Sequence, residues 1–113
     1  MNLPLEQQAW FAGRIDQETA TERIKALPVG TFLVRSRGIH HEFALDLRTQ
    51  DGVKHLKVYR DRDGDEERFS FSPARSFPTL QGLIGHYRTN DLLENFSYSH
   101  MVGAKLKLPY KNA

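Results

Sequence analysis

The stretch Gly30-Thr31-Phe32-Leu33-Val34-Arg35-Ser36-Arg37 indicates a buried strand that carries an arginine near its end. Its unbroken apolar run, 32–34, is typical of a central strand covered on both faces. Side chains alternate along a strand, so Arg35 points where Leu33 points, toward the interior. A buried guanidinium is costly unless an anion pairs with it, and its planar fork matches phosphate or carboxylate. That anion is either a group inside the protein or a ligand.

Length and composition restrict the function classes. A chain of 113 residues is expected to form one domain. It contains no cysteine, which excludes disulfides, Cys-based zinc sites and thiol catalysis and is compatible with the cytosol. Its net charge of +2 is too small for a nucleic-acid signature without clustered Lys and Arg. Because no apolar run approaches the roughly 20 residues of a membrane span, we expect neither membrane insertion nor a signal peptide.

The first third of the chain predicts a helix that follows a short apolar element. Residues 1–8 look like an unanchored lead-in, and the apolar element spans 10–13. Asp16 is a favourable N-cap for a helix over 17–27, which Pro28 ends. The predicted buried face of that helix consists of Ala20, Ile24 and Leu27.

The middle of the chain predicts an antiparallel meander. Its strands are expected at 31–37, 43–47 and 53–59. The last two are joined by Asp51-Gly52, a strong hairpin signal. We interpret 61–67 as a charged turn that leads to a short strand at 69–71.

The last third predicts a second helix over 79–89. Its core-facing stripe has helical spacing and consists of Leu80, Leu83, Ile84 and Tyr87. The following segment, 90–98, is interpreted as a loop, and the alternation in 105–108 indicates pairing at a sheet edge before Pro109. The order of elements predicts an α+β sandwich with one helix on each face of the sheet.

Several of these segments together carry a family resemblance. They are Trp10-Phe11-Ala12-Gly13, the stretch 30–35, Phe43-Ala44-Leu45, the stretch 53–58, and the apolar positions Phe77, Leu80, Leu83, Ile84, Tyr87, Leu108 and Pro109. Their order and spacing resemble the Src homology 2 (SH2) domain, the phosphotyrosine-binding module of cytoplasmic signalling proteins. The resemblance implies a central antiparallel β-sheet flanked by one α-helix on each face. It also implies a single domain, 1–113, with its core at about 10–109.

Within that family the chain looks most like the Vav guanine-nucleotide exchange factors. The likeness rests on residues 10–13, Glu42-Phe43-Ala44, Val53-Lys54-His55 with Leu56, Asn90 with Leu92, and 108–111. It implies a non-catalytic module that recruits a Rho/Rac exchange factor from the cytoplasm to tyrosine-phosphorylated receptors or adaptors. Any exchange activity then lies outside these residues. The alternatives are the SH2 domain of another adaptor or kinase, or a degenerate SH2 fold that binds unphosphorylated protein.

The resemblance assigns the phosphotyrosine pocket. It places Arg35 at the pocket floor, where it forks two phosphate oxygens, and Lys57 against the phosphotyrosine ring in a cation–π contact. Arg37 shares the face of Arg35 and either lines the same pocket or is a solvated strand end. His55 either lines the pocket or bonds the backbone of a neighbouring strand. Gln17 stands where the family usually has an arginine, so binding is weaker or Arg37 and Lys57 carry more of it.

A second groove is implied on the opposite face of the sheet. Leu56 points away from His55 and Lys57, toward the residues that follow the phosphotyrosine. A Vav-like preference there is for a small apolar or acidic residue followed by acidic and proline positions. The segments 72–76 and 89–100 are expected to wall this groove, and 38–41 to cover the phosphate with backbone N–H donors.

Other functions have weak support in the sequence. His40 and His41 are not expected to hold a metal, because adjacent side chains diverge and no third ligand is evident. Asp46, His55 and a serine form only a nominal triad, since no nucleophile elbow or phosphate loop accompanies them. We therefore expect a monomer with no metal, cofactor, nucleic-acid partner or catalytic activity.

Overall fold

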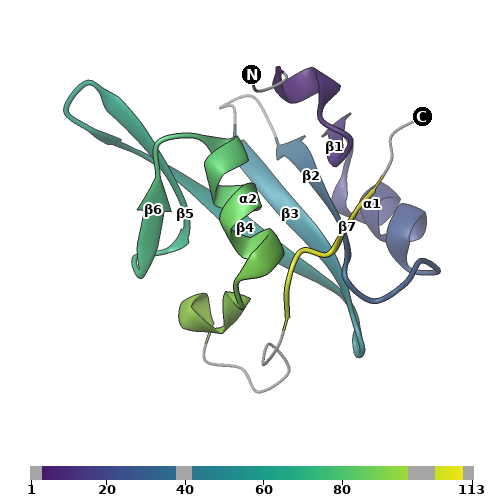
Figure 1. Ribbon diagram of the computed structural model, residues 1–113. Helices are drawn as coiled ribbons and strands as arrows, with labels where there is room; N and C mark the ends of the chain where they lie inside the picture. The colour runs from purple at the N-terminus through teal and green to yellow at the C-terminus, as the bar shows by residue number, and fades with distance from the viewer. Residues whose placement is uncertain (1–3, 38–41, 97–103, 111–113) are drawn as a thin grey trace.

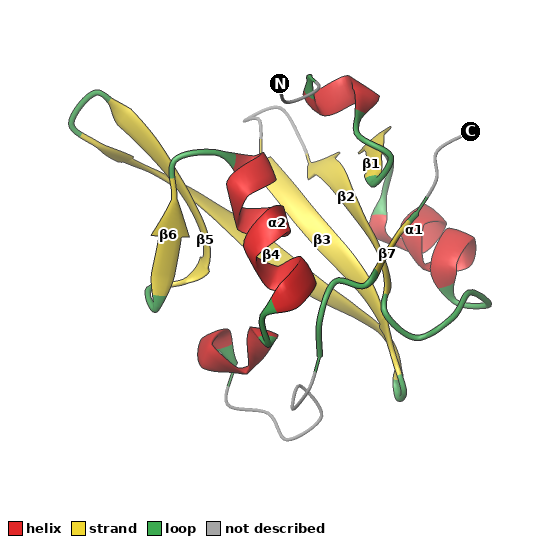
Figure 2. Cartoon of the chain, viewed as in Figure 1, coloured by secondary structure: helices red, strands yellow, loops and turns green. Residues whose placement is uncertain are grey.

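A seven-stranded sheet with a helix on each face forms the described part of the computed structural model, residues 4–37, 42–96 and 104–110 (Figure 1). The strands are β1 (Phe11–Arg14), β2 (Thr31–Arg37), β3 (Glu42–Thr49), β4 (Gly52–Asp63), β5 (Glu66–Ser72), β6 (Arg75–Phe77) and β7 (Leu108–Pro109). The helices are α1 (Gln17–Ile24) and α2 (Leu80–Thr89), with short 3-10 turns η1 (Leu5–Gln7) and η2 (Leu92–Asn95) (Figure 2).

The predicted meander forms the centre of the sheet. The strand order is β1-β2-β3-β4-β5-β6, with β2, β3 and β4 antiparallel. β1 and β7 both run parallel to β2 and pair with different parts of it, at Val34 and at Thr31. β4 pairs with β3 as far as Val58 and with β5 from Tyr59 onward. The β4–β5 hairpin therefore leaves the central sheet and projects from the body (Figure 1).

Each face of the sheet has its own apolar cluster, as the alternation in β2 requires. Phe32 and Val34 contribute to the larger cluster, which includes the buried stripe of α2. Leu33, on the other face, packs with Ala20 and Ile24 of α1. The sequence prediction of one helix on each face is confirmed.

The first helix is shorter than predicted. α1 ends at Ile24, and Leu27 lies beyond it with 37% of its surface exposed. The carbonyl of Lys25, just past the helix, accepts from the Nε of Arg48 at 2.9 Å instead of from a further helical turn. Pro28 in addition disfavours helical geometry at Leu27. Leu27 is therefore wrongly predicted as part of the buried face.

The charged segment 61–67 is also different from the prediction. β4 continues to Asp63, and only Gly64 and Asp65 form the turn before β5. Both faces of this hairpin carry charged residues, so it lacks the apolar alternation that identifies a strand. An ion pair across the two strands supports the hairpin instead, with Nη2 of Arg60 at 2.5 Å from Oε1 of Glu67.

Smaller differences occur in segments that were interpreted as loops. The lead-in contains η1, and Leu5 packs against the larger apolar cluster. β6 lies partly within 72–76, and η2 lies within 90–98. The edge pairing predicted for 105–108 occurs at Leu108–Pro109. Each of these elements is at most four residues long, too short for a periodic pattern.

Gly30 allows β7 to reach β2. Its φ is +97°, and its carbonyl oxygen accepts from the backbone N–H groups of Lys107 and Leu108, each at 3.0 Å. A Cβ at this position would lie 2.9 Å from the Cβ of Lys107. The chain can make this close approach because residue 30 has no side chain.

We predict that Gly30→Ala destabilises the protein by about 1 to 3 kcal/mol, since it adds a clash to left-handed strain. Urea unfolding measures the change. Gly64→Ala is the matched control, because Gly64 has a φ of +66° but nothing within 4 Å of a new Cβ. Equal losses in the two variants would show that the contact with Lys107 is unimportant.

Candidate functional site

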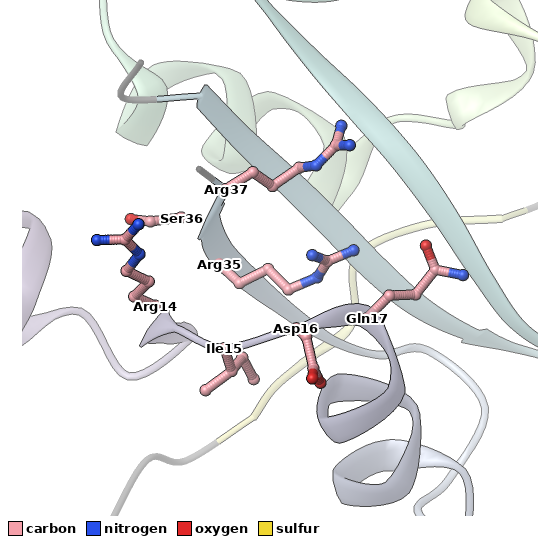
Figure 3. Close-up of a pocket in the computed structure, with 7 residues that line it drawn as sticks. All are labelled: Arg14, Ile15, Asp16, Gln17, Arg35, Ser36 and Arg37. Carbon is pink, nitrogen blue, oxygen red and sulfur yellow. The ribbon is translucent and has the colours of Figure 1, made fainter. Parts of the chain in front are cut away.

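A cavity of about 410 Å³ lies between the start of α1 and the end of β2. Its lining residues are Arg14, Ile15, Asp16, Gln17, Arg35, Ser36 and Arg37. Arg35 and Arg37 extend from β2 to the same side, and Gln17 reaches that side from the first turn of α1 (Figure 3). The guanidinium of Arg14 turns the other way (Figure 3). The structure thus brings together three of the predicted phosphate-binding residues.

Asp16 lines the cavity, and its carboxylate also caps the helix. Its Oδ1 accepts from the Thr19 backbone N–H at 2.7 Å, the predicted N-cap. Hydrogen bonds from the side chain and backbone of Thr19 lower the pKa of Asp16, and the positive charge of Arg35 contributes less. The carboxylate is therefore ionised at neutral pH and bonded to the start of α1, and it places one negative charge beside the arginines of the cavity.

The buried guanidinium of Arg35 has an internal partner. Only 5% of Arg35 is exposed, and its Nε donates to Oδ2 of Asp46 at 2.8 Å. Asp46 is fully buried on β3, and its Oδ1 lies 2.5 Å from Nδ1 of His55 on β4. The internal anion thus pairs with the Nε edge of the guanidinium, and the two Nη nitrogens have no partner among the described residues.

Lys57 and His55 lie on the same face of the sheet as Arg35 but do not line the cavity. Arg35, Ala44 and Lys57 are neighbours across β2, β3 and β4, so only a small side chain separates the two cations. The Nζ of Lys57 lies 4.9 Å from the centre of the Tyr59 ring. One predicted role for His55 was a bond to the backbone of a neighbouring strand. The structure shows a side-chain partner instead, the carboxylate of Asp46.

The opposite face of the sheet holds Leu56. It is buried in the larger apolar cluster with 7% of its surface exposed, so its contact with a peptide stays a prediction. The two segments expected to wall the second groove are joined to each other. Arg75 donates to Glu94 at 2.8 Å, and Ser72 donates to Asn95 at 2.6 Å. Residues 38–41 and 97–100, including His40 and His41, lie outside the described residues.

Two members of the nominal triad, Asp46 and His55, contact each other, and the hydroxyl beside His55 belongs to Thr21 instead of a serine. Thr21 Oγ1 lies 3.4 Å from Nε2 of His55, which itself contacts Asp46. The single hydroxyl proton of Thr21 is donated to the Gln17 carbonyl at 3.0 Å, its shorter contact. The hydroxyl is therefore not activated by His55. Within the described residues, no cluster of metal-ligating side chains occurs either.

Sequence reasoning named Asp46 only in the nominal triad and missed its role as the internal partner of Arg35. Its signal was available, because it interrupts an apolar strand on the face opposite Phe43, Leu45 and Leu47. That is the face of Arg35. Without the strand register, however, the sequence does not place Asp46 opposite His55 and beside Arg35.

Comparison with known proteins identifies the fold family. Residues 10–87 match the family model of the SH2 domain. The chain belongs to the SH2 domain family. It is 39% identical over 95% of its length to Protein vav of Drosophila melanogaster, of which it spans 14%.

Two solved structures are similar to this SH2 domain. One is the SH2 domain of the human proto-oncogene protein VAV1, with a TM-score of 0.82, 27% identity and coverage of 98% of this chain and 76% of that one. The other is the VAV1 SH2 domain complexed with a tyrosine-phosphorylated peptide from SLP76, with a TM-score of 0.81, 26% identity and the same coverage. In the part of our chain that the structure describes, no helix is long and apolar enough to cross a bilayer.

Glu94 gives a testable pH dependence at the wall of the second groove. Hydrogen bonds from Arg75 and then from the Tyr87 hydroxyl lower the pKa of Glu94 from 4.5 to about 2. A lowered folded-state pKa stabilises the fold above pH 4.5, and this stabilisation is lost as the pH falls toward 2. We predict that Glu94→Gln costs about 1 kcal/mol or less at pH 6, because solvent screens the partly exposed ion pair.

Urea unfolding at pH 6 and pH 3 measures the effect, and the difference between wild type and Glu94→Gln is expected to shrink at pH 3. Glu66→Gln, at the exposed start of β5, removes the same charge as a control. A difference that grows at low pH would contradict the assigned ion pair.

Proposed function

We propose that this SH2 domain is a non-catalytic module that binds phosphotyrosine peptides. The observation that carries the proposal is the half-satisfied guanidinium of Arg35, whose Nε is held by Asp46 and whose Nη pair is without a described partner. A phosphotyrosine brings a charge of about −1.5 to −2 and three strong acceptor oxygens. The similar VAV1 domain, solved with a tyrosine-phosphorylated peptide from SLP76, supports the same ligand class.

The position of Arg35 supports selectivity for phosphotyrosine. The guanidinium is buried between α1 and the sheet, and the more exposed Arg37 and Gln17 stand above it. A phosphoserine side chain is too short to reach an arginine at this depth. Lys57, one small residue away across the sheet, is placed for a cation–π contact with the incoming ring.

The role in a larger protein is inferred from the same likeness. The chain spans 14% of the Drosophila relative. We propose that any exchange activity toward Rho/Rac proteins lies outside these residues. We propose that residues 1–113 act as one monomeric domain in the cytoplasm, with a core at about 10–109. It recruits a Vav-like parent to tyrosine-phosphorylated receptors or adaptors. Leu56 then contributes to the choice of peptide, and neither nucleic acid nor a cofactor takes part.

One observation favours a second candidate, a domain that binds unphosphorylated protein. Gln17 lacks the charge that the family usually has at this position, and it is exposed at the mouth of the cavity. Equal affinity for a phosphorylated peptide and its unphosphorylated twin would support this candidate. A clear preference for the phosphorylated peptide would exclude it.

We predict that Arg35→Lys weakens phosphotyrosine-peptide binding by about 100-fold or more, because lysine loses the bidentate fork. Calorimetric titration measures it. Lysine is preferred to alanine, since alanine leaves the buried carboxylate of Asp46 without the charge of Arg35. The control is Arg14→Lys, which lines the same cavity but points away from Arg35 (Figure 3). Wild-type affinity in Arg35→Lys would refute the assigned role.

We predict that Gln17→Arg strengthens phosphopeptide binding by about three- to tenfold, because it adds a charged donor on the side reached by Arg35 and Arg37. Gln50→Arg, at the exposed β3–β4 turn, adds the same charge away from the cavity. The same titration compares the two variants. An equal gain in both would mean that only the net charge matters.

A further inference from the structure

We propose that Asp46 is a positioning residue of the phosphate pocket, which orients both Arg35 and His55 through its two carboxylate oxygens. This inference rests on the proposed function and deepens it. Asp46 contacts no ligand itself, because it is fully buried beneath the residues that do. Its role is to hold three strands, β2, β3 and β4, in one hydrogen-bonded unit.

The burial of Asp46 requires two donors. An ionised carboxylate accepts hydrogen bonds only, and burial without partners is strongly unfavourable. Oδ2 accepts from Nε of Arg35 at 2.8 Å, and Oδ1 lies 2.5 Å from Nδ1 of His55. Both carboxylate oxygens of Asp46 are therefore occupied. If either Arg35 or His55 is lost, only one contact remains to compensate the buried negative charge of Asp46.

The contact with Nε decides which edge of Arg35 faces the cavity. A guanidinium has five N–H donors in one plane, and an anion can approach more than one edge. Because Asp46 occupies Nε, the two Nη groups are directed to the remaining space. A side chain fixed in this way loses less conformational entropy when phosphate binds. Asp46 thus prepares the terminal fork of Arg35 before the ligand arrives.

The second oxygen orients His55. A carboxylate acceptor at Nδ1 requires the proton of the ring to be on that nitrogen, which assigns the tautomer. The other edge of the ring lies beside α1, with Nε2 at 3.4 Å from Thr21 Oγ1. His55 is directly opposite Asp46 in the strand register. It therefore stabilises the buried carboxylate from below the pocket.

The negative charge of Asp46 also repels a phosphate. An orienting role and a purely electrostatic role therefore predict opposite effects when this charge is removed. Asp46→Asn removes a negative charge from beneath the pocket, so on electrostatic grounds alone phosphate affinity rises. If orientation dominates, affinity falls, because a neutral amide oxygen holds Nε of Arg35 less strongly than a carboxylate, and the NH2 group of the amide can only donate to His55, which reverses the tautomer. The sign of the change therefore identifies the role.

The test is calorimetric titration of wild type, Asp46→Asn and Asp51→Asn with a phosphotyrosine peptide and its unphosphorylated twin. We expect Asp46→Asn to bind about tenfold more weakly or worse. Asp51→Asn, at the exposed β3–β4 turn, removes the same charge away from the pocket and is expected to bind like wild type. Unchanged or tighter binding in Asp46→Asn overturns the inference. No phospho-dependent binding by wild type overturns the proposed function as well.

A measurement on the wild type keeps the inference testable if Asp46→Asn does not fold. Nitrogen-15 NMR reports the Nε–H exchange of each arginine and the protonated ring nitrogen of each histidine. We expect slow exchange of the Arg35 Nε–H and a proton on Nδ1 of His55. Arg37 is the internal control, since it is exposed and has no hydrogen bond to a described residue. Exchange of Arg35 as fast as that of Arg37 overturns the inference.

Discussion

The burial of one guanidinium constrains the rest of this structure. Arg35 is on a central strand beneath α1, where a lone positive charge would be strongly unfavourable. Asp46 supplies the compensating charge from the neighbouring strand, and His55 supplies the second donor that Asp46 needs. The outer edge of Arg35 remains open to the cavity. The fold thus stabilises a positive charge in its interior, and the proposed phosphate ligand would meet the edge of Arg35 that Asp46 does not occupy.

The period of two in a strand divides the two expected binding regions. Along β4, His55 and Lys57 lie on the α1 face, and Leu56 lies between them on the α2 face. The segments expected to wall the second groove are joined by the ion pair of Arg75 with Glu94. On β4, therefore, the basic side chains of His55 and Lys57 face α1, and the buried apolar side chain of Leu56 faces α2.

Sequence patterns predicted the elements that have a clear physical signal. The N-cap at Asp16, the β3–β4 hairpin and the stripe of α2 were all predicted because each depends on local chemistry or periodicity. The hairpin turn itself lies one residue earlier than predicted, at Gln50-Asp51, because Gly52 already pairs with Thr49. The β4–β5 hairpin was not recognised, since charge pairing stabilises it without apolar alternation. The end of α1 was misplaced because Arg48, distant in the sequence, satisfies the carbonyl of Lys25 just past the helix.

The sequence by itself determined that Arg35 faces the interior, that a helix covers each side of the sheet, and that the chain resembles SH2 domains. These conclusions depend on residue order and strand alternation. Only the tertiary structure decided which anion pairs with Arg35. Asp46 and Arg35 are 11 residues apart, and they meet only because the register of β2 and β3 sets their side chains on one face. Strand register arises from packing of the whole sheet, and a single strand does not encode it.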